Sequence, residues 1–501
     1  MNISRRWFIG GAVSALALNG CKMFSTRIGT YSSGKANLTF GVISDVHIRF
    51  DPNTHMVGLS SSSSGETLEN TLRWFRDQGV DAVVIAGDIT DYGIIAELQL
   101  VADIWNKVFP NNKSPDGRIV EKVFVSGNHD VEGFIYRKFG EKCWPDKNEL
   151  KKNILVSDFK KNWERIFNEE YNDIYKKEIN GYTFIGQHWG KQGWGANCKF
   201  DLIKPFMDEN KSKINTSLPF FYIQHPHPKN TCHGPRAWGA DTGITTEVLS
   251  NFPTAVAFSG HSHYPLYDKN VIWQEAFTSI GTASLRYLTF NSKGAIGNGV
   301  GGFENSNNEA KNIKHLANEN KIMQPINWYN TRQGLLVKVF DDCMTILRRD
   351  FSHEEIIGEE WVMPLSTAEG KPFSFVEHAK RLHSPEFPKD SKIIVKKSRG
   401  KNRGKEAKEK DILVIDFPKA DAFGNDNLTH YEIFVEAKDD KQNQTRRMIS
   451  VNVVQPGKKA KEFTLRIACD TLPTNTNYRF IITPISSFGS KGKPILSDWM
   501  T

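Results

Sequence analysis

The chain has 501 residues, of which 39% are hydrophobic and 24% are charged. This composition excludes a disordered chain and a protein built of long membrane-spanning segments. The formal net charge of +8 lies mostly in Lys396–Lys410, which holds eight basic and two acidic residues, so it does not indicate nucleic-acid binding. The length leaves room for two or three domains.

The first 21 residues have the features of an export signal and are set apart from the fold. Arg5 and Arg6 precede an apolar run, Gly10–Leu18, which is too short to span a bilayer. This pattern resembles a twin-arginine signal, and the following Leu18–Cys21 resembles a bacterial lipobox with Cys21 as the acylated residue. We therefore expect an exported protein, periplasmic or on the cell surface, anchored to the membrane of a bacterium. The alternatives are a soluble secreted protein cleaved nearby and a short amphipathic anchor.

Three apolar runs in the first part of the chain each end in side chains that can bind a metal or move a proton. The runs predict strands at Leu38–Ile43, Asp81–Ala86 and Val123–Val125. The polar residues that follow are Asp45 and His47, then Asp88, then Asn128, His129 and Asp130. Helical patterns at Glu66–Gln78 and Ile94–Phe109 separate the runs, which indicates βαβ units. Ligand sites in such sheets lie beyond the carboxyl ends of the strands.

Histidines follow two later apolar runs in the same way. Predicted strands at Leu218–Gln224 and Thr254–Phe258 end in His225 and in the pair His261 and His263. The other predicted elements are a charged, mainly helical insertion at 134–178, a strand at 182–187, a loop rich in glycine and tryptophan at 188–195, a helix at 200–211 that Pro205 would kink, and strands at 273–280, 335–340 and 344–349. The loop at 294–302 has five glycines but lacks the lysine and spacing of a phosphate-binding loop, so it receives no catalytic role.

The donors at these strand ends are all oxygen or nitrogen atoms. The seven predicted metal ligands are Asp45, His47, Asp88, Asn128, His225, His261 and His263. No thiolate belongs to the set, so Mn, Fe or Zn suits it better than Cu(I). Seven donors exceed the needs of one four-coordinate ion, and they predict two divalent or trivalent ions that share one carboxylate.

The five blocks in this order resemble the calcineurin-like metallophosphoesterase superfamily. They read DVH at Asp45–His47, GDITD at Gly87–Asp91, GNHD at Gly127–Asp130, the strand-end His225, and GHSH at Gly260–His263. The resemblance covers Leu38 to Phe351, and the five blocks together are far more specific than any one of them. It implies an α/β fold, a four-layer αββα sandwich.

The resemblance also implies a role for each residue. One metal would be held by Asp45, His47, Asp88 and His263, and the other by Asp88, Asn128, His225 and His261. A hydroxide bridging the two ions would attack phosphorus, while His129, oriented by Asp130, would assist the leaving oxygen. Protein Ser/Thr phosphatases carry an arginine where this chain has Tyr92, so the chain looks closer to the broader phosphodiesterase-like members. Arg49 is a further residue that could contact a phosphate.

The remaining third of the chain predicts a second, all-β domain. Short alternating strands are predicted at 393–395, 412–415, 431–435, 448–454, 463–467 and 478–484. Leu472–Tyr478 resembles the tyrosine corner of fibronectin type III domains. The predicted division is an export signal at 1–21, a tether at 22–37, a catalytic domain at 38–365, a linker at 366–389 and a fibronectin type III-like β-sandwich at 390–501. The basic run at 396–410 is either a solvated loop between strands or a contact for anionic lipid or polysaccharide.

These observations predict an exported hydrolase with two metal ions. Its substrate would be a small phosphomonoester or phosphodiester, its membrane contact would be the lipid on Cys21, and no nucleic-acid partner is expected. The alternative is a catalytically inert surface-binding lipoprotein that acts through its β-sandwich domain. The loops at 50–65, 134–178 and 189–238 would form the pocket, so the substrate itself is not determined by the motifs.

Overall fold

A computed structural model gives the structure of most of the chain. It describes residues 34–51, 56–57, 65–136, 159–190, 200–234, 237–289, 331–365, 370–381, 383–401, 409–422, 427–450 and 461–501. The export signal, the glycine-rich loop at 294–302, and parts of the predicted insertion, the tryptophan loop and the basic run lie outside the described residues.

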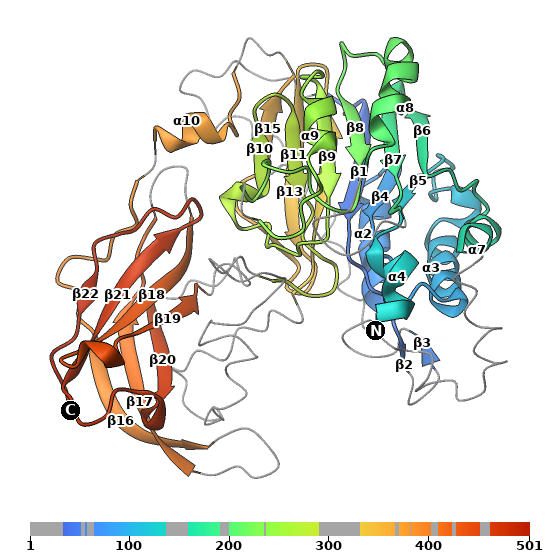
Figure 1. The fold of residues 1–501 in the computed structure, drawn as a ribbon. Coiled ribbons are helices and arrows are strands. Elements are labelled where there is room, and N and C mark those ends of the chain that lie inside the picture. Colours follow the sequence, from blue (N-terminus) through green and yellow to red (C-terminus); the bar gives the residue numbers. More distant parts are fainter. Residues whose placement is uncertain are drawn as a thin grey trace, which may run out of the picture.

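Two mixed β-sheets form the centre of the first 365 residues (Figure 1). The first sheet has the order β14-β13-β12-β1-β4-β5, and β15 also pairs with β13. Its strands are β1 (Leu38–Ile43), β4 (Ala82–Ala86), β5 (Glu121–Val125), β12 (Gln333–Val339), β13 (Cys343–Asp350), β14 (Glu355–Ile356) and β15 (Trp361–Pro364). β1, β4 and β5 run parallel, and β12 closes on β1 antiparallel.

The second sheet has the order β10-β11-β9-β8-β7-β6. Its strands are β6 (Ile174–Ile179), β7 (Tyr182–Gln187), β8 (Phe220–Ile223), β9 (Ala255–Ser259), β10 (Ile272–Gln274) and β11 (Thr278–Gly281). β7, β8, β9 and β11 are parallel, so the carboxyl ends of β8 and β9 meet at one edge. The short strands β2 (Phe50–Asp51) and β3 (Met56–Val57) form a separate pair.

The inner faces of the two sheets pack against each other through aromatic rings. The ring of Phe40 on β1 lies 5.2 Å from that of Phe184, 4.8 Å from that of Phe221 and 5.8 Å from that of Phe258, all on the second sheet. Strands covered on both faces are apolar throughout, as AVVIA of β4 is, with all five of its residues buried.

Helices cover the outer face of each sheet. The first is covered by α2 (Gly65–Asp77), α3 (Ile95–Val108) and α7 (Phe159–Phe167), and the second by α8 (Ile203–Asn210) and α9 (Ile244–Leu249). Leu68, Leu72 and Phe75 give α2 its buried face at helical spacing. α4 (Asn128–Tyr136) starts directly after β5. The predicted α/β fold of four layers is therefore confirmed.

Two predicted elements differ from the structure. The predicted helical insertion contains α7 but then forms the edge strand β6, because Asn180 and Gly181 both have positive φ angles and turn the chain into β7. An Asn-Gly pair between two alternating runs is a strong hairpin signal. Pro205 does not kink a helix, since α8 begins only at Ile203 and Pro205 lies in its first turn. Backbone N–H groups of the first turn have no partner within a helix, so the N–H that proline lacks is not missed there.

Beyond residue 390 the chain forms two further sheets. One has the order β16-β17-β20 and the other β19-β18-β21-β22. The strands are β16 (Ile394–Lys401), β17 (Glu409–Pro418), β18 (Leu428–Ala437), β19 (Gln444–Ile449), β20 (Glu462–Ala468), β21 (Tyr478–Ser486) and β22 (Ile495–Leu496), and α10 (Phe375–Ala379) precedes them. Within the described part of the chain, no helix is both long and apolar enough to cross a membrane.

The contact between the two central sheets predicts the effect of shortening Phe40. We expect Phe40→Ala to lower the free energy of unfolding by about 3–5 kcal/mol, because it leaves a cavity beside three aromatic rings. Phe40→Leu keeps most of the volume and is expected to cost only about 1–1.5 kcal/mol. Urea denaturation followed by circular dichroism measures both, and equal costs for the two variants would contradict this packing.

Candidate metal centre

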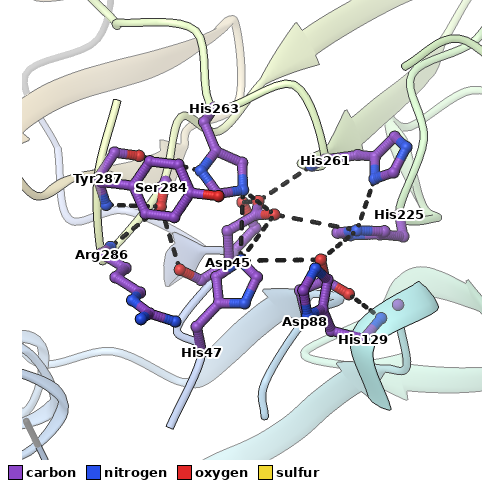
Figure 2. A network of polar contacts seen from close by, with 12 residues as sticks. Asp45, His47, Asp88, His129, His225, His261, His263, Ser284, Arg286 and Tyr287 are labelled. Atoms are coloured by element: carbon purple, nitrogen blue, oxygen red, sulfur yellow. Dashed lines mark hydrogen bonds and ion pairs between the residues drawn. The ribbon is translucent and has the colours of Figure 1, made fainter. Parts of the chain in front are cut away.

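The predicted ligands come from the carboxyl ends of five strands in both sheets. Asp45 and His47 follow β1, Asp88 follows β4 and Asn128 follows β5 in the first sheet. The second sheet contributes His225 after β8, and His261 and His263 after β9. Figure 2 shows six of these side chains, all but Asn128, directed toward one another between the two sheets.

Five of these residues have backbone angles that ordinary residues rarely adopt. The φ angles are 51° at Asp45, 48° at His47, 50° at Asp88, 68° at His261 and 56° at His263. Left-handed backbone at non-glycine residues is strained, and such strain concentrates at functional sites. Hydrogen bonds from Asp45 N to Gly87 O (2.9 Å) and from His47 N to Asp88 O (3.0 Å) hold the first two loops together.

Two glycines of the motifs allow the loops to approach closely. A Cβ atom at Gly87 would lie 2.3 Å from Nδ1 of His225, and one at Gly127 would lie 2.2 Å from Oδ1 of Asp88. Gly87 also has a φ angle of 88°. Any other residue at these two positions would push the donors of neighbouring strands apart.

The donors form two adjacent clusters. Ligand atoms of Asp45, His47 and His263 all lie within 4.8 Å of one another, and so do those of Asp88, His225 and His261. In the first cluster Nε2 of His263 is 2.8 Å from Oδ1 of Asp45. In the second, Nε2 of His225 is 3.1 Å from Oδ2 of Asp88.

Asp88 lies between the clusters. Its Oδ2 atom is 3.1 Å from His225 Nε2 in one cluster and 3.8 Å from His47 Nε2 in the other. Asn128 begins α4 beside this carboxylate, because the backbone N–H of the next residue, His129, donates to Oδ1 of Asp88 at 2.8 Å. The arrangement leaves Asp88 as the carboxylate that two ions could share.

The second ring nitrogens of three histidines are already engaged. His225 Nδ1 lies 2.8 Å from Ala86 O, His263 Nδ1 lies 3.0 Å from Tyr287 O, and His47 Nδ1 lies 3.2 Å from Asp91 Oδ1. Such partners orient metal-binding imidazoles and leave the inward nitrogen as the donor atom. The inward nitrogens then converge, with His47 Nε2 only 3.4 Å from His263 Nε2.

One buried oxygen indicates that the donor set suits cations. Oδ1 of Asp45 is buried and accepts no hydrogen bond from the described residues, although Nε2 atoms of three histidines lie 2.8–3.9 Å away. Buried carboxylates need a compensating charge. A set of carboxylate oxygens and imidazole nitrogens with this separation fits borderline divalent ions.

The pKa values of the metal-free cluster are shifted by the same contacts between carboxylates and imidazoles. Burial by itself would raise the pKa of Asp45, but the nearby His263 and His225 lower it below its usual value. Burial opposes a proton on His225, yet Asp88 and Asp45 raise its pKa to about 9. The pKa of His47 is lowered to about 3, first by burial. A cation entering the site would therefore displace a proton from His225.

The structure differs from the prediction for the partner of His129. Asp130 does not contact the His129 ring in any described interaction. Its carboxylate accepts hydrogen bonds from backbone N–H groups of Gly127 (2.8 Å), Ile89 (3.1 Å) and Thr90 (2.7 Å), and from the Thr90 hydroxyl (2.7 Å). Asp130 therefore ties the loop after β4 to the loop after β5.

Asp91 is the carboxylate beside His129. Its Oδ1 atom is 3.2 Å from His129 Nδ1, and it also contacts His47 and Arg286. The charge of Arg286, together with bonds from the two histidines, outweighs burial and holds the pKa of Asp91 well below its usual value. Asp91 belongs to the GDITD block, so its spacing of three from Asp88 was visible in the sequence, whereas Arg286 belongs to no motif.

Aromatic rings line the cluster of Asp88, His225 and His261. The buried Trp189 lies 5.9 Å from the ring of His225 and 5.7 Å from that of His261, while the rest of the predicted tryptophan loop, 191–195, is outside the described residues. Trp238, which no motif indicated, stacks on His261 at 4.5 Å. On the other side, the ring of Tyr287 lies 4.3 Å from that of His263.

Comparison with known proteins agrees with these motifs. Residues 38–265 match the family model described as calcineurin-like phosphoesterase. No curated protein matches the chain. Among solved structures, a dimetal phosphatase from Danio rerio is 12% identical, with a TM-score of 0.37 over 66% of this chain and 100% of that one. A purple acid phosphatase from yellow lupin (Lupinus luteus) seeds is 10% identical, with a TM-score of 0.39 over 67% of this chain and 56% of that one.

The family match covers all five strand ends that carry the predicted ligands, three in the first sheet and two in the second, since it extends from β1 to the residues just after GHSH. It covers the two donor clusters as well as the GDITD and GNHD blocks. Residues 38–265 therefore form a calcineurin-like phosphoesterase domain, and the chain is a metal-dependent phosphoric ester hydrolase.

Proposed function

We propose that this chain is an exported phosphoesterase that uses two metal ions to hydrolyse a small phosphomonoester or phosphodiester. The observation that carries the proposal is the position of Asp88 between two clusters of buried aspartate and histidine donors. One ion would be held by Asp45, His47, Asp88 and His263, and the other by Asp88, Asn128, His225 and His261. The donors suit Mn, Fe or Zn.

Bound there, such ions would supply Lewis acidity toward the phosphate and would lower the pKa of bound water. The chain's own residues orient the donors and handle the proton of the leaving group. Asp91 engages Nδ1 of His129, so Nε2 is the atom that would donate a proton to the leaving oxygen. His129 is well placed for this role, because it is partly exposed whereas the aspartate and histidine donors around it are buried.

The C-terminal sheets support the proposal of a fibronectin type III-like domain. Three strands form one sheet and four form the other, which is the strand count of a seven-stranded sandwich. Such a domain could position the enzyme at the cell surface. In the described part of the basic run, Lys396 pairs with Asp416 and Arg399 with Glu409, which favours a solvated surface over lipid binding there.

The shared position of Asp88 predicts that its amide variant loses both metal and activity. We expect Asp88→Asn to lower kcat/KM for p-nitrophenyl phosphate by more than about 100-fold in the presence of Mn²⁺. Elemental analysis should show a loss of bound metal from the same sample. Asp103→Asn, an exposed change on α3, is the matched control. A fully active Asp88→Asn enzyme would refute the proposed centre.

The contact between His129 and Asp91 predicts a dependence on the leaving group. His129→Gln is expected to slow an alkyl phosphate by about 10²–10⁴-fold, because a poor leaving group needs a proton. p-Nitrophenolate leaves readily, so its ester should be affected much less. Asp91→Asn should show the same preference to a smaller degree. Equal effects on the two esters would assign His129 to binding instead of proton transfer.

The export signal predicts a defined fractionation of cells that produce the full chain. Replacing Arg5 and Arg6 by lysine is expected to retain the protein in the cytoplasm, because the twin-arginine pair is read by its transport machinery. Cys21→Ser is expected to release the exported protein from the membrane fraction, since it removes the site of acylation. Immunoblots of the fractions measure both, and an unchanged distribution would contradict the proposed signal.

A further inference from the structure

One buried carboxylate, that of Asp91, is shared by two guanidinium groups. Its Oδ1 atom lies 3.2 Å from Nη1 of Arg286, and its Oδ2 atom lies 3.2 Å from Nε of Arg49. His47 and His129 also bind Oδ1 through their Nδ1 atoms. In the contacts between described residues, the single negative charge of Asp91 faces the two permanent positive charges of Arg286 and Arg49, so these three side chains together carry a surplus positive charge.

The exposed fractions show where that surplus can meet a ligand. Asp91 is fully buried and the Arg286 side chain is 3% exposed, whereas His129 is 12% and Arg49 is 34% exposed. A buried guanidinium needs a carboxylate to compensate its positive charge, and Asp91 compensates that of Arg286. Arg49 is the cation on the open side of the network, next to the histidine proposed to meet the leaving group.

The position of Arg49 is fixed at its inner nitrogen. Nε lies 3.0 Å from the hydroxyl of Tyr92 as well as 3.2 Å from Asp91, and the guanidinium lies 5.6 Å from the Tyr92 ring centroid. Among the described residues, no hydrogen bond involves the terminal Nη atoms of Arg49, whose hydrogen bond and closest carboxylate contact are both made by Nε. The two terminal amines of a guanidinium form a fork that matches two oxygens of a phosphate.

We propose that Arg49 binds a terminal phosphate oxygen that only a monoester possesses, and that it thereby makes the enzyme selective for dianionic phosphomonoesters. This inference rests on the proposed phosphoesterase function. A monoester has three terminal oxygens and two negative charges, while a diester has two terminal oxygens, one charge and a second ester group. An anchored, partly exposed cation stabilises the additional charge and gains little from an uncharged ester oxygen.

The selectivity is tested with two substrates that share a leaving group. We compare p-nitrophenyl phosphate with bis(p-nitrophenyl) phosphate at about pH 8, where the monoester is a dianion. Arg49→Ala is expected to lower kcat/KM for the monoester by about 10- to 100-fold while changing that for the diester by less than about threefold. Arg49→Lys keeps the charge without the fork and should give an intermediate ratio.

Arg73→Ala is the matched control for the loss of one positive charge. Arg73 is 38% exposed and pairs with Glu69 on α2, away from the metal centre. Its variant should leave both rates unchanged. If Arg49→Ala lowers the rates for both substrates equally, or lowers neither, the inference is overturned. If Arg49→Ala does not fold, a reduced ratio in folded Arg49→Lys supports the inference and an unchanged ratio overturns it.

A binding measurement provides a readout that does not depend on turnover. Calorimetry with inorganic phosphate and dimethyl phosphate compares a dianion with a monoanion that carries two ester groups. Arg49→Ala should weaken the binding of phosphate by about 10-fold or more and leave that of dimethyl phosphate unchanged. Equal weakening of both overturns the inference. Failure of the proposed function would be seen separately, as a wild-type enzyme that hydrolyses neither ester with added metal.

Discussion

The carboxylates of Asp45 and Asp88 are buried among imidazole rings at the junction of two sheets, and the rest of the catalytic domain is arranged around that concentration of charge. Buried carboxylates are costly unless a cation and hydrogen bonds compensate them. The histidines do so in part, and their inward nitrogens converge closely enough to share an ion. The chemistry of a metal-dependent phosphoesterase follows from this requirement for positive charge.

The donors of this cluster are held by strained backbone. Hydrogen bonds between the loops and packing between the two sheets offset that strain. Five of the donors have left-handed backbone angles. Loops after β1 and β4 are joined by backbone hydrogen bonds, and Asp130 collects three backbone N–H groups from the loops after β4 and β5. The aromatic contacts between the sheets supply the stability against which this strain is maintained. Asp130 thus holds the two loops together, while Asp91 links the cluster to His129 and to two arginines.

The C-terminal sheets contact the catalytic domain near the loop that follows GHSH. Nδ2 of Asn427 donates to the carbonyl of Tyr267 at 2.7 Å, and Nδ2 of Asn270 donates to the carbonyl of Ser487 at 3.1 Å. His378 of α10, in the predicted linker, stacks on Phe488 at 3.9 Å. Buried apolar residues of both parts, among them Leu266 and Tyr431, also belong to one hydrophobic cluster, so the contact between the parts is apolar as well as polar.

The sequence by itself determined the donors and the strands that carry them, because each motif is local. An apolar run followed by polar residues describes a strand end without knowledge of its neighbours, and this was enough for Asp45, Asp88 and His225. The hairpin at Asn180 and Gly181 was equally local, yet the charge of the surrounding segment obscured it. Only the tertiary structure decided which carboxylate meets His129.

Asp91 and Asp130 are both acidic residues close to His129 in the sequence motifs. In the structure the Asp91 carboxylate contacts the His129 ring, whereas that of Asp130 binds backbone N–H groups of two loops. Arg49 and Arg286 lie 237 positions apart in the chain, and no spacing in the sequence predicts that they share one carboxylate. The stacking of Trp238 on His261 is of the same kind. Contacts between loops from different strands depend on the packing of the two sheets, which local sequence patterns do not encode.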